Sequence, residues 1–385
     1  MKKVTLFINS LTSGGAERVL SIIATELVAQ QREVHLLCIE KDNVYSLPKE
    51  VKITYLSTLS KHDSSLKKLL YLPYVAYKLK KYIKKNQTTL IQSHIYRANF
   101  SNILAKIFGA KHQVQVVEVT SINNLKEGGL SKKINYALIK LLYQHADMVI
   151  FKAQKMKEEF LKNIPNVKNY TVINNPYDIH KISTLAQEPV EDFTFSKVKK
   201  YLVSVGRLSS EKRFITLINV LKNLDENIEL LLIGEGEEAE NLKRFTHENK
   251  LEQRVHFLGR KENPFKYIKQ ADIFVLASQG EGFPNVIIEA MICATPVIST
   301  DCISGPREIL APNIDINFQL RSNIELAKNG ILYPVDDEKS LSSAIKIMLS
   351  DSPKQKEYIA NGLVQSQKYA LKKIIQQYKE VLCVA

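Results

Sequence analysis

The chain has 385 residues, of which 45% are hydrophobic and 24% are charged, an ordinary composition for a globular protein large enough for two domains. No apolar stretch approaches the length of about 18 residues that a membrane-spanning helix needs, and residues 2–8, followed by Asn9 and Ser10, do not fit a signal peptide. Its four cysteines form no Cys-x-x-Cys pair and no metal-ligand spacing, so we expect buried, reduced thiols in a cytoplasmic protein.

The excess of positive charge lies in one half of the chain. Residues 1–190 carry 28 Lys and Arg against 14 Asp and Glu, whereas the other 26 basic and 26 acidic residues cancel. A net charge of +14 concentrated in one half indicates an anionic partner, which could be nucleic acid, a membrane surface or a phosphorylated substrate. No paired Cys/His spacing and no RNP-like aromatic strand is present, so the sequence does not favour nucleic acid.

The first half alternates strand-like and helix-like patterns. A strand at 4–9 leads through the Gly14–Gly15 turn into an amphipathic helix with Val19, Leu20 and Ile23 on one face. Further strands are predicted at 33–39, 51–56, 89–93, 112–118, 146–151 and 170–174. Between 174 and 197 the pattern lapses around two prolines, and this stretch is the predicted interdomain linker.

The segment 67–85 (KKLLYLPYVAYKLKKYIKK) mixes leucines and tyrosines with many lysines. A basic amphipathic helix of this kind fits an anionic membrane surface, where each Lys contributes about 1 kcal/mol. Pro73 has to begin or kink that helix. The alternative is a core helix with a lysine-rich face in solvent, because its apolar residues must also pack onto a sheet.

The second half repeats the alternation. Strands are predicted at 201–205, 230–234, 254–259, 271–278 and 295–300, and a final helix begins near residue 361. Strands that alternate with helices predict βαβ units and mainly parallel sheets, so the expected fold class is α/β.

The motif GRLSSEKRF (206–214) follows one of these strands. It places Arg207, Lys212 and Arg213 in one loop and the first turn of a helix. Cations at a helix N-terminus oppose the macrodipole, which favours acids there. A bound anion would resolve this conflict, since Arg offers phosphate a bidentate fork and Lys a mobile charge. The alternative is a solvated basic surface.

Glu281 and Glu289 stand eight residues apart in the motif EGFPNVIIE. Glu281 lies in the turn after the strand 271–278, and Glu289 lies about one turn inside a helix that Asn285 is expected to cap. Both carboxylates would face the crevice outside the carboxyl ends of the strands, where open α/β sheets bind ligands. A phosphate group could meet the helix start while a carboxylate holds ribose hydroxyls. The alternative is a surface turn with two solvated acids.

Together the two motifs resemble those of glycosyltransferase family 4, a family with the GT-B fold. The family's G-R-L-x-x-x-K matches Gly206, Arg207, Leu208 and Lys212, and its E-G-F-x-x-x-x-x-E matches Glu281, Gly282, Phe283 and Glu289. The opening SLTSGGAERVL resembles the family's N-terminal Gly-rich turn, although it is not a G-x-G-x-x-G dinucleotide motif. The resemblance covers nearly the whole chain.

This resemblance implies two Rossmann-like domains that face each other across a cleft. We expect an acceptor-binding domain over 1–185 and a nucleotide-sugar-binding domain over 186–365. The C-terminal helix, 366–385, is expected to cross back onto the N-terminal domain.

On the donor side, the resemblance implies that Arg207 and Lys212 stabilise the leaving diphosphate, that Glu281 orients the sugar and that Glu289 holds the ribose. No Asp-x-Asp motif stands beside an apolar strand, so these cations are expected to replace a divalent metal, and neither a metal site nor a cofactor is expected. The other donor-binding candidates are Gly15, Gly206, Gly234, Gly259, Arg260, Gly282, Phe283, Pro284 and Asn285. The segment 299–310 (STDCISGPREIL) resembles a loop of relatives that add hexoses or N-acetylhexosamines to lipid-linked oligosaccharides.

On the acceptor side, the resemblance implies that the Gly-rich turn faces the interdomain cleft, and His94 follows a predicted strand end, where functional side chains gather. The alternatives are a simple tight turn and a structural histidine. The candidates are Gly14, Glu17, His94, Arg97 and Glu118, with Arg97 as a partner for an acceptor phosphate. Many relatives have a histidine after the glutamate, where this chain has Val119, so no catalytic role is carried over to that position.

The expected function is that of a retaining glycosyltransferase which moves a hexose or N-acetylhexosamine from a UDP-sugar to an undecaprenyl-diphosphate-linked glycan, in surface polysaccharide assembly. Such an enzyme would be cytoplasmic and peripheral on the inner face of the cytoplasmic membrane, with an anionic lipid surface and no nucleic acid as partner. The alternatives are transfer to a soluble acceptor and a non-catalytic protein that binds sugar nucleotides.

Overall fold

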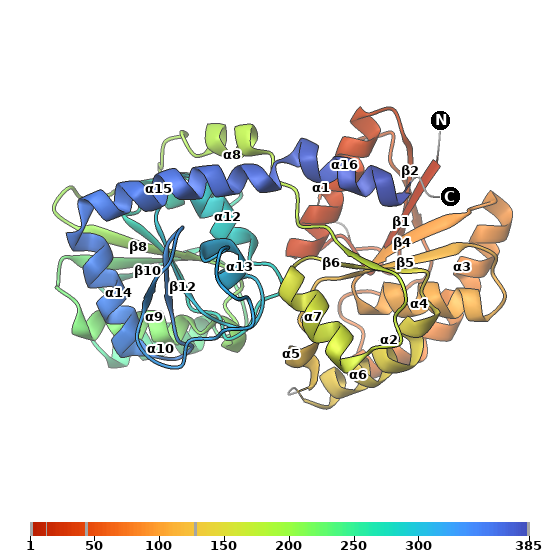
Figure 1. The fold of residues 1–385 in the computed structure, drawn as a ribbon, viewed down its shortest axis with the longest axis horizontal. Helices are drawn as coiled ribbons and strands as arrows, with labels where there is room; N and C mark the ends of the chain where they lie inside the picture. Colours follow the sequence, from red (N-terminus) through yellow and green to blue (C-terminus); the bar gives the residue numbers. More distant parts are fainter. Residues whose placement is uncertain (1–2, 13, 43–44, 127–128, 383–385) are drawn as a thin grey trace. The chain divides into compact units, whose positions relative to one another are not determined.

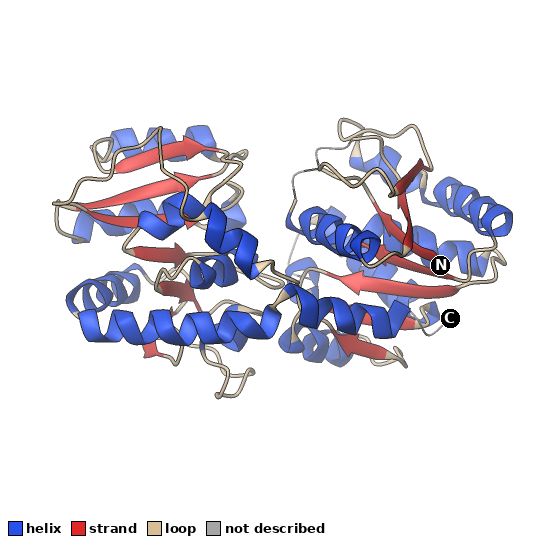
Figure 2. Ribbon diagram, turned by 90° about the horizontal axis from the view of Figure 1, so that it is seen from above, coloured by secondary structure: helices blue, strands red, loops and turns tan. Residues whose placement is uncertain are grey.

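The computed structural model describes residues 3–12, 14–42, 45–126 and 129–382, which form two compact α/β units (Figure 1). The first unit runs to Pro176 and takes up the chain again at Leu371, and the second unit spans Tyr177–Ala370. In each unit a sheet lies between layers of helices (Figure 2). None of the helices in the described part of the chain combines the length and apolar character that a bilayer span requires.

The first sheet is wholly parallel and has the strand order β3-β2-β1-β4-β5-β6-β7. Its strands are β1 (Lys3–Ile8), β2 (Glu33–Cys38), β3 (Lys52–Tyr55), β4 (Leu90–His94), β5 (Gln113–Glu118), β6 (Met148–Phe151) and β7 (Tyr170–Val172). Its helices are α1 (Gly15–Ala29), α2 (Ser65–Leu70), α3 (Leu72–Asn86), α4 (Tyr96–Ile107), α5 (Ile122–Lys126), α6 (Leu130–Leu142), α7 (Gln154–Asn163) and α16 (Leu371–Leu382).

Alternation along the strands sends side chains to opposite faces of this sheet. On β1, Leu6 and Ile8 join a core cluster with α1 and α16, whereas Phe7 joins a separate cluster with α3 and α4. Both faces are therefore apolar, which explains why these strands read as nearly continuous hydrophobic runs.

The second sheet has the order β10-β9-β8-β11-β12-β14-β13 and is parallel except for the edge strand β13. Its strands are β8 (Lys200–Val205), β9 (Ile228–Ile233), β10 (Val255–Gly259), β11 (Ile273–Leu276), β12 (Val297–Thr300), β13 (Glu325–Leu326) and β14 (Ile331–Tyr333). Its helices are α8 (Ile179–Leu185), α9 (Phe214–Val220), α10 (Ala239–Glu248), α11 (Phe265–Gln270), α12 (Asn285–Ile292), α13 (Pro306–Leu310), α14 (Glu338–Ser350) and α15 (Ser352–Ser366).

Strand order reverses once in each sheet. In the first sheet the reversal lies between β1 and β4, and in the second between β8 and β11. Loops that leave the carboxyl ends of two such strands run to opposite faces of the sheet and leave a crevice between them, and this is where open α/β sheets bind ligands. Each unit therefore has one topologically defined place for a site.

The twelve strands predicted from hydrophobic runs are all present, whereas β13 and β14 were not predicted. The predicted linker, 174–197, contains α8, which packs against α11 and α12 and so belongs to the second unit. The final helix predicted from residue 361 is interrupted, because α15 ends at Ser366 and α16 starts at Leu371. Three of the four cysteines (Cys38, Cys293 and Cys302) are free and buried, and Cys383 lies outside the described residues.

Candidate active site

The two predicted donor motifs meet at the strand-order reversal of the second sheet. The segment 206–213 follows β8, and Glu281 follows β11, the neighbouring strand. Lys212 ends a short 3-10 turn, and its Nζ lies 2.5 Å from Oε1 of Glu281. An ion pair thus joins two residues that are 69 positions apart in the sequence, at the strand-order reversal of the second sheet.

Lys212 is held in its charged form. Burial opposes the ammonium, but the carboxylate of Glu281 outweighs that effect and raises the pKa of Lys212 above its ordinary value. The side chain keeps 29% of its surface exposed, so an anion can still reach it.

The three cations of this segment all have carboxylate partners. Arg207 pairs with Glu237 at 3.0 Å, and Arg213 pairs with Asp336 at 2.6 Å. Acidic side chains therefore already balance these charges without a ligand, and binding of an anion between the cations stays a prediction. Arg207 is 72% exposed and its pair with Glu237 is weak, so it remains available to a ligand.

The predicted glycines lie side by side at the carboxyl ends of β8, β9 and β10. The Gly206 N–H donates to Ile233 O at 3.0 Å, and the Gly234 N–H donates to Gly259 O at 2.9 Å. Gly234 has φ +149°, and a Cβ there would lie 1.8 Å from Gly206 O. Only glycine fits this close approach of Gly234 to the backbone of Gly206. Arg260 follows directly and is exposed.

The turn after Glu281 leads into α12, which begins at Asn285. Pro284 is the N-cap residue, so the prediction that Asn285 caps this helix is wrong. The Asn285 Oδ1 instead accepts a hydrogen bond of 2.5 Å from the hydroxyl of Tyr177. Glu289 is inside α12 as predicted, but it is only 1% exposed, so it is not one of two solvated acids.

A second loop supports this turn from the side. The Ser304 hydroxyl donates to Gly282 O at 3.0 Å, and the Glu281 N–H approaches Ile303 O at 3.4 Å. Gly305 has φ +92°, and a Cβ there would lie 2.3 Å from Cδ of Pro284. The segment 303–305, which the sequence singled out only by resemblance, therefore shapes the predicted donor turn.

The acceptor-side candidates Gly14 and Glu17 and the donor candidate Gly15 lie at the start of α1, beyond the carboxyl end of β1. A Cβ on Gly14 would lie 2.1 Å from Oε2 of Glu17, so glycine leaves room for that carboxylate. Burial raises the pKa of Glu17. The Thr12 hydroxyl, which donates a hydrogen bond of 3.4 Å to the Glu17 carboxylate, has a smaller effect in the opposite direction. Gly15, assigned to the donor, is exposed.

Arg97 follows β4, on the other side of the strand-order reversal. Its guanidinium lies 2.7 Å from Glu40, which also pairs with Lys68 at 3.2 Å. The Arg97 side chain is 22% exposed, and two cations share one carboxylate, so this cluster has a surplus positive charge beside the first sheet's crevice.

His94 and Glu118 are both buried in the first unit, with 1% exposed surface each. His94 Nε2 lies 3.2 Å from the Gln92 amide oxygen, and burial together with the charge of Lys152 lowers the pKa of His94 well below its ordinary value. Burial raises the pKa of Glu118 to about 8, and its Oε1 accepts a hydrogen bond from the Tyr143 hydroxyl. This geometry does not support the prediction that these two side chains contact the acceptor.

Sequence reasoning passed over two buried polar groups here. Tyr143 links Glu118 with Asn99, whose amide donates to the Tyr143 oxygen at 2.9 Å. Lys152 follows β6 and donates to the Tyr378 hydroxyl of α16, and burial lowers the pKa of Lys152 to about 7. A lysine directly after an apolar strand is the only sequence signal that could have indicated such a group.

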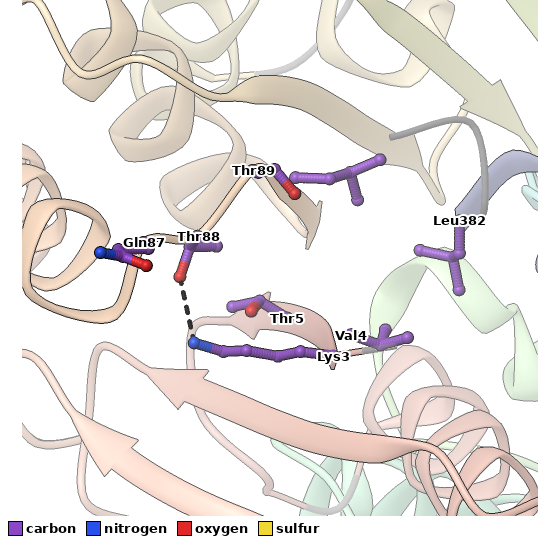
Figure 3. Close-up of a pocket in the computed structure, with 8 residues that line it drawn as sticks. Lys3, Val4, Thr5, Gln87, Thr88, Thr89 and Leu382 are labelled. Carbon is purple, nitrogen blue, oxygen red and sulfur yellow. Dashed lines mark hydrogen bonds between the residues drawn. The ribbon is translucent and has the colours of Figure 1, made fainter. Parts of the chain in front are cut away.

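A hollow of about 140 Å³ lies at the opposite end of the first sheet (Figure 3). It is lined by Lys3, Val4, Thr5, Gln87, Thr88, Thr89, Leu90 and Leu382. Apart from Leu382 at the end of α16, these residues lie at the amino ends of β1 and β4, whereas the crevice expected to bind ligands lies at the carboxyl ends. We therefore do not assign this hollow to the site.

Two family models match the chain and together cover most of it. The model described as Glycosyltransferase Family 4 matches residues 13–181, and the model described as Glycosyl transferases group 1 matches residues 187–364. The two matches meet close to the passage from the first unit to the second.

Individual relatives extend over the same length. The chain is 31% identical over 360 residues, 93% of both chains, to the N-acetylgalactosamine-N,N'-diacetylbacillosaminyl-diphospho-undecaprenol 4-alpha-N-acetylgalactosaminyltransferase of Campylobacter jejuni. It is 25% identical over 387 residues, 99% of this chain and 98% of the other, to the GalNAc-alpha-(1->4)-GalNAc-alpha-(1->3)-diNAcBac-PP-undecaprenol alpha-1,4-N-acetyl-D-galactosaminyltransferase of the same species. The solved structure of Anabaena HepE in complex with UDP has a TM-score of 0.75 at 20% identity over all of both chains, which shows a shared fold.

Proposed function

The chain belongs to glycosyltransferase family 4 and has the GT-B fold, and on that premise we propose that it transfers a hexose or N-acetylhexosamine from a UDP-sugar to a lipid-linked oligosaccharide, with retention of the anomeric configuration. The donor part of this proposal rests on one observation above all. The ion pair of Lys212 and Glu281 joins the two motifs at the strand-order reversal of the second sheet.

This geometry suits a diphosphate leaving group. Lys212 and Arg207 supply positive charge, and Gly206, Gly234 and Gly259 keep the ends of β8, β9 and β10 free of side chains. Charge that grows on the leaving diphosphate is stabilised best by cations already fixed in place. In this proposal the two cations take the part that a divalent metal plays in other transferases.

The acceptor part of the proposal draws on two relatives and on charge. Both Campylobacter jejuni proteins are named for transfer to glycans on diphospho-undecaprenol or PP-undecaprenol. In this chain, Arg97 and Lys68 share Glu40 near the crevice of the first sheet, and the whole net charge of +14 lies in residues 1–190. A diphosphate-linked lipid would match that surplus of positive charge.

The membrane part of the proposal rests on the outer face of α2 and α3. Pro73 lies in the first turn of α3, so the predicted basic helix is two helices. Leu72, Val75, Leu79 and Ile83 are buried and Lys78, Lys81, Lys84 and Lys85 are exposed, as the alternative of a core helix with a lysine-rich outer face predicts. The outer face nevertheless keeps large apolar side chains beside its lysines: Leu66, Leu70, Tyr74 and Tyr77. This composition fits an anionic lipid surface.

A donor screen tests the central proposal. The purified protein would be titrated with UDP-, GDP- and ADP-sugars, with and without EDTA, and binding would be followed by thermal shift. We expect one UDP-sugar to raise the melting temperature equally in both conditions. Loss of the shift in EDTA would contradict metal independence, and a shift with a GDP- or ADP-sugar alone would contradict the choice of nucleotide.

Transfer to a soluble acceptor remains the competing proposal. It predicts no affinity for anionic vesicles, whereas the lipid-linked acceptor predicts binding that weakens as salt is added. Sedimentation with vesicles that contain anionic phospholipid separates the two.

A further inference from the structure

The second unit begins and ends at two neighbouring points. Tyr177 is its first residue and Ala370 its last, and the two form a parallel β-bridge. The Tyr177 N–H also donates to Tyr369 O at 3.0 Å. The two chain segments that lead into and out of this unit are therefore fastened to each other.

The same two tyrosines contact the predicted donor turn. The Tyr177 hydroxyl donates to Asn285 Oδ1 at 2.5 Å, and the Tyr369 ring packs edge-on against Phe283 with centroids 5.3 Å apart. The Tyr177 and Tyr369 rings also contact each other, with centroids 6.5 Å apart. All three rings are buried, so these contacts have fixed geometry and little competition from water.

The turn at 282–285 is thus held from two sides. The loop 303–305 supports Gly282 and Pro284, and the two tyrosines support Phe283 and Asn285. Asn285 is the first residue of α12, after the N-cap Pro284, and the bond from Tyr177 fixes the orientation of its amide.

We propose that Tyr177 and Tyr369 are positioning residues for donor binding, which set Asn285 and Phe283 and link that turn to the two segments joining the units. The inference rests on the proposed function, because it takes 283–285 as donor-binding residues. By reciprocity, a nucleotide that stabilises the turn also stabilises the bridge between Tyr177 and Ala370.

The test compares Tyr177→Phe with Tyr369→Phe. Both remove one hydroxyl from a buried ring, but within the described part of the chain the Tyr369 hydroxyl has only a long hydrogen bond of 3.4 Å from the Gln365 amide. In the protein without nucleotide, we expect amide exchange in peptides covering 282–288 to quicken about three- to tenfold in Tyr177→Phe, the range for loss of one buried hydrogen bond. Tyr369→Phe should leave exchange there within about twofold, since its hydroxyl does not reach the turn.

Nucleotide binding supplies the second readout, with UDP as the probe and GDP alongside it. Tyr177→Phe should raise the Kd for UDP and the donor KM about three- to tenfold, with kcat and the acceptor KM unchanged. In the parent, UDP should slow exchange in peptides that contain Tyr177 and Tyr369. A hydroxyl with a merely structural role would lower the melting temperature without this split between KM and kcat.

The results distinguish a failure of the positioning inference from a failure of the proposed function. If the parent binds neither UDP nor GDP, the donor proposal fails, and the exchange comparison still decides the positioning claim. If exchange at 282–288 is as slow in Tyr177→Phe as in the parent, Tyr177 does not position the turn and the inference is overturned. Equal effects of both variants would overturn it too, since the Tyr369 hydroxyl does not reach the turn.

Discussion

One neighbouring carboxylate, that of Glu281, keeps the Lys212 side chain charged. A partly buried lysine without a partner would lose part of its charge, and Glu281 prevents this by raising the pKa of Lys212. The pair is close enough to fix the ammonium and open enough to admit a phosphate oxygen. Its arrangement is that of a preorganised electrostatic site.

We therefore expect Lys212→Ala to lower kcat for sugar transfer by about a hundred- to a thousandfold, the loss typical of one transition-state donor. Arg207→Ala should lower kcat as well, by less, because its side chain is mostly in solvent. The measurement is the initial rate with the donor selected by the binding screen. Lys243→Ala, an exposed lysine on α10 paired with Glu240, is the matched control. Rates within a few-fold of the parent for both site variants would make the diphosphate assignment wrong.

Glu118 illustrates the opposite effect of burial on an acid. Burial raises its pKa from 4.5 to about 8, so the folded protein holds it as a neutral acid that accepts from Tyr143. The folded state then binds a proton that the unfolded state releases between those two pH values. Its stabilising effect is complete below pH 4.5 and is lost as the pH rises through about 8.

Glu118→Gln tests this assignment, because the amide keeps the shape and an acceptor oxygen but cannot ionise. Between about pH 5 and 8, the free energy of unfolding of the parent should fall relative to the variant, by at most about 1.4 kcal/mol per pH unit. Melting temperatures of both proteins across this range provide the measurement. Parallel curves would show that Glu118 is already ionised in the folded protein.

The helix α3 has one face in the core of the first unit and one face exposed. Its inner face completes the core beneath the first sheet, and its outer face carries Tyr74 and Tyr77 with Lys78 and Lys81 over their rings, at 5.4 and 4.6 Å. The amphipathic pattern alone could not tell which apolar residues face the sheet. The packing assigns Leu72, Val75, Leu79 and Ile83 to the core and Tyr74 and Tyr77 to the surface, whereas Tyr82 packs against the core cluster.

Reversing charge on this outer face should weaken membrane binding. The double variant Lys81→Glu/Lys84→Glu should bind anionic vesicles at least tenfold more weakly, since each lysine contributes about 1 kcal/mol and each reversal adds repulsion. Lys346→Glu/Lys356→Glu, the same change on exposed lysines of α14 and α15, is the control and should bind like the parent. Equal loss in both would point to net charge instead of a defined surface.

The last helix of the chain, α16, returns to the first unit. The helix α16 is separated from the rest of the first unit by the entire second unit, yet Ile374, Ile375 and Tyr378 belong to the core beneath β1 and β2. Gln115 of β5 adds a hydrogen bond of 2.7 Å to Val381 O. The first unit therefore needs the end of the chain to complete one face of its sheet.

Ile375→Asp should destabilise the first unit and leave the second unit folded. Burying a charge without a partner where an apolar side chain was fully covered costs several kcal/mol, on the order of the largest single-site effects. Hydrogen exchange should quicken in β1 and β2 and stay unchanged in β8, β9 and β11. Lys373→Asp, on the exposed side of the same helix, serves as the control. Equal loss of protection in both sheets would mean that the units do not unfold separately.

The sequence by itself determined the strands, because runs such as 201–205 and 271–278 are buried on both faces and so carry a continuous apolar signal. It also determined that Lys212 and Glu281 share a site, since each follows such a strand inside a motif of recognisable spacing. The resemblance also predicted that the C-terminal helix returns to the first domain, as α16 does. The tertiary structure alone decided the partners: Asn285 bonds Tyr177 instead of capping α12, and His94 and Glu118 are buried. The physical reason is that burial and strand order depend on contacts between residues far apart in the chain, whereas hydrophobic periodicity is local.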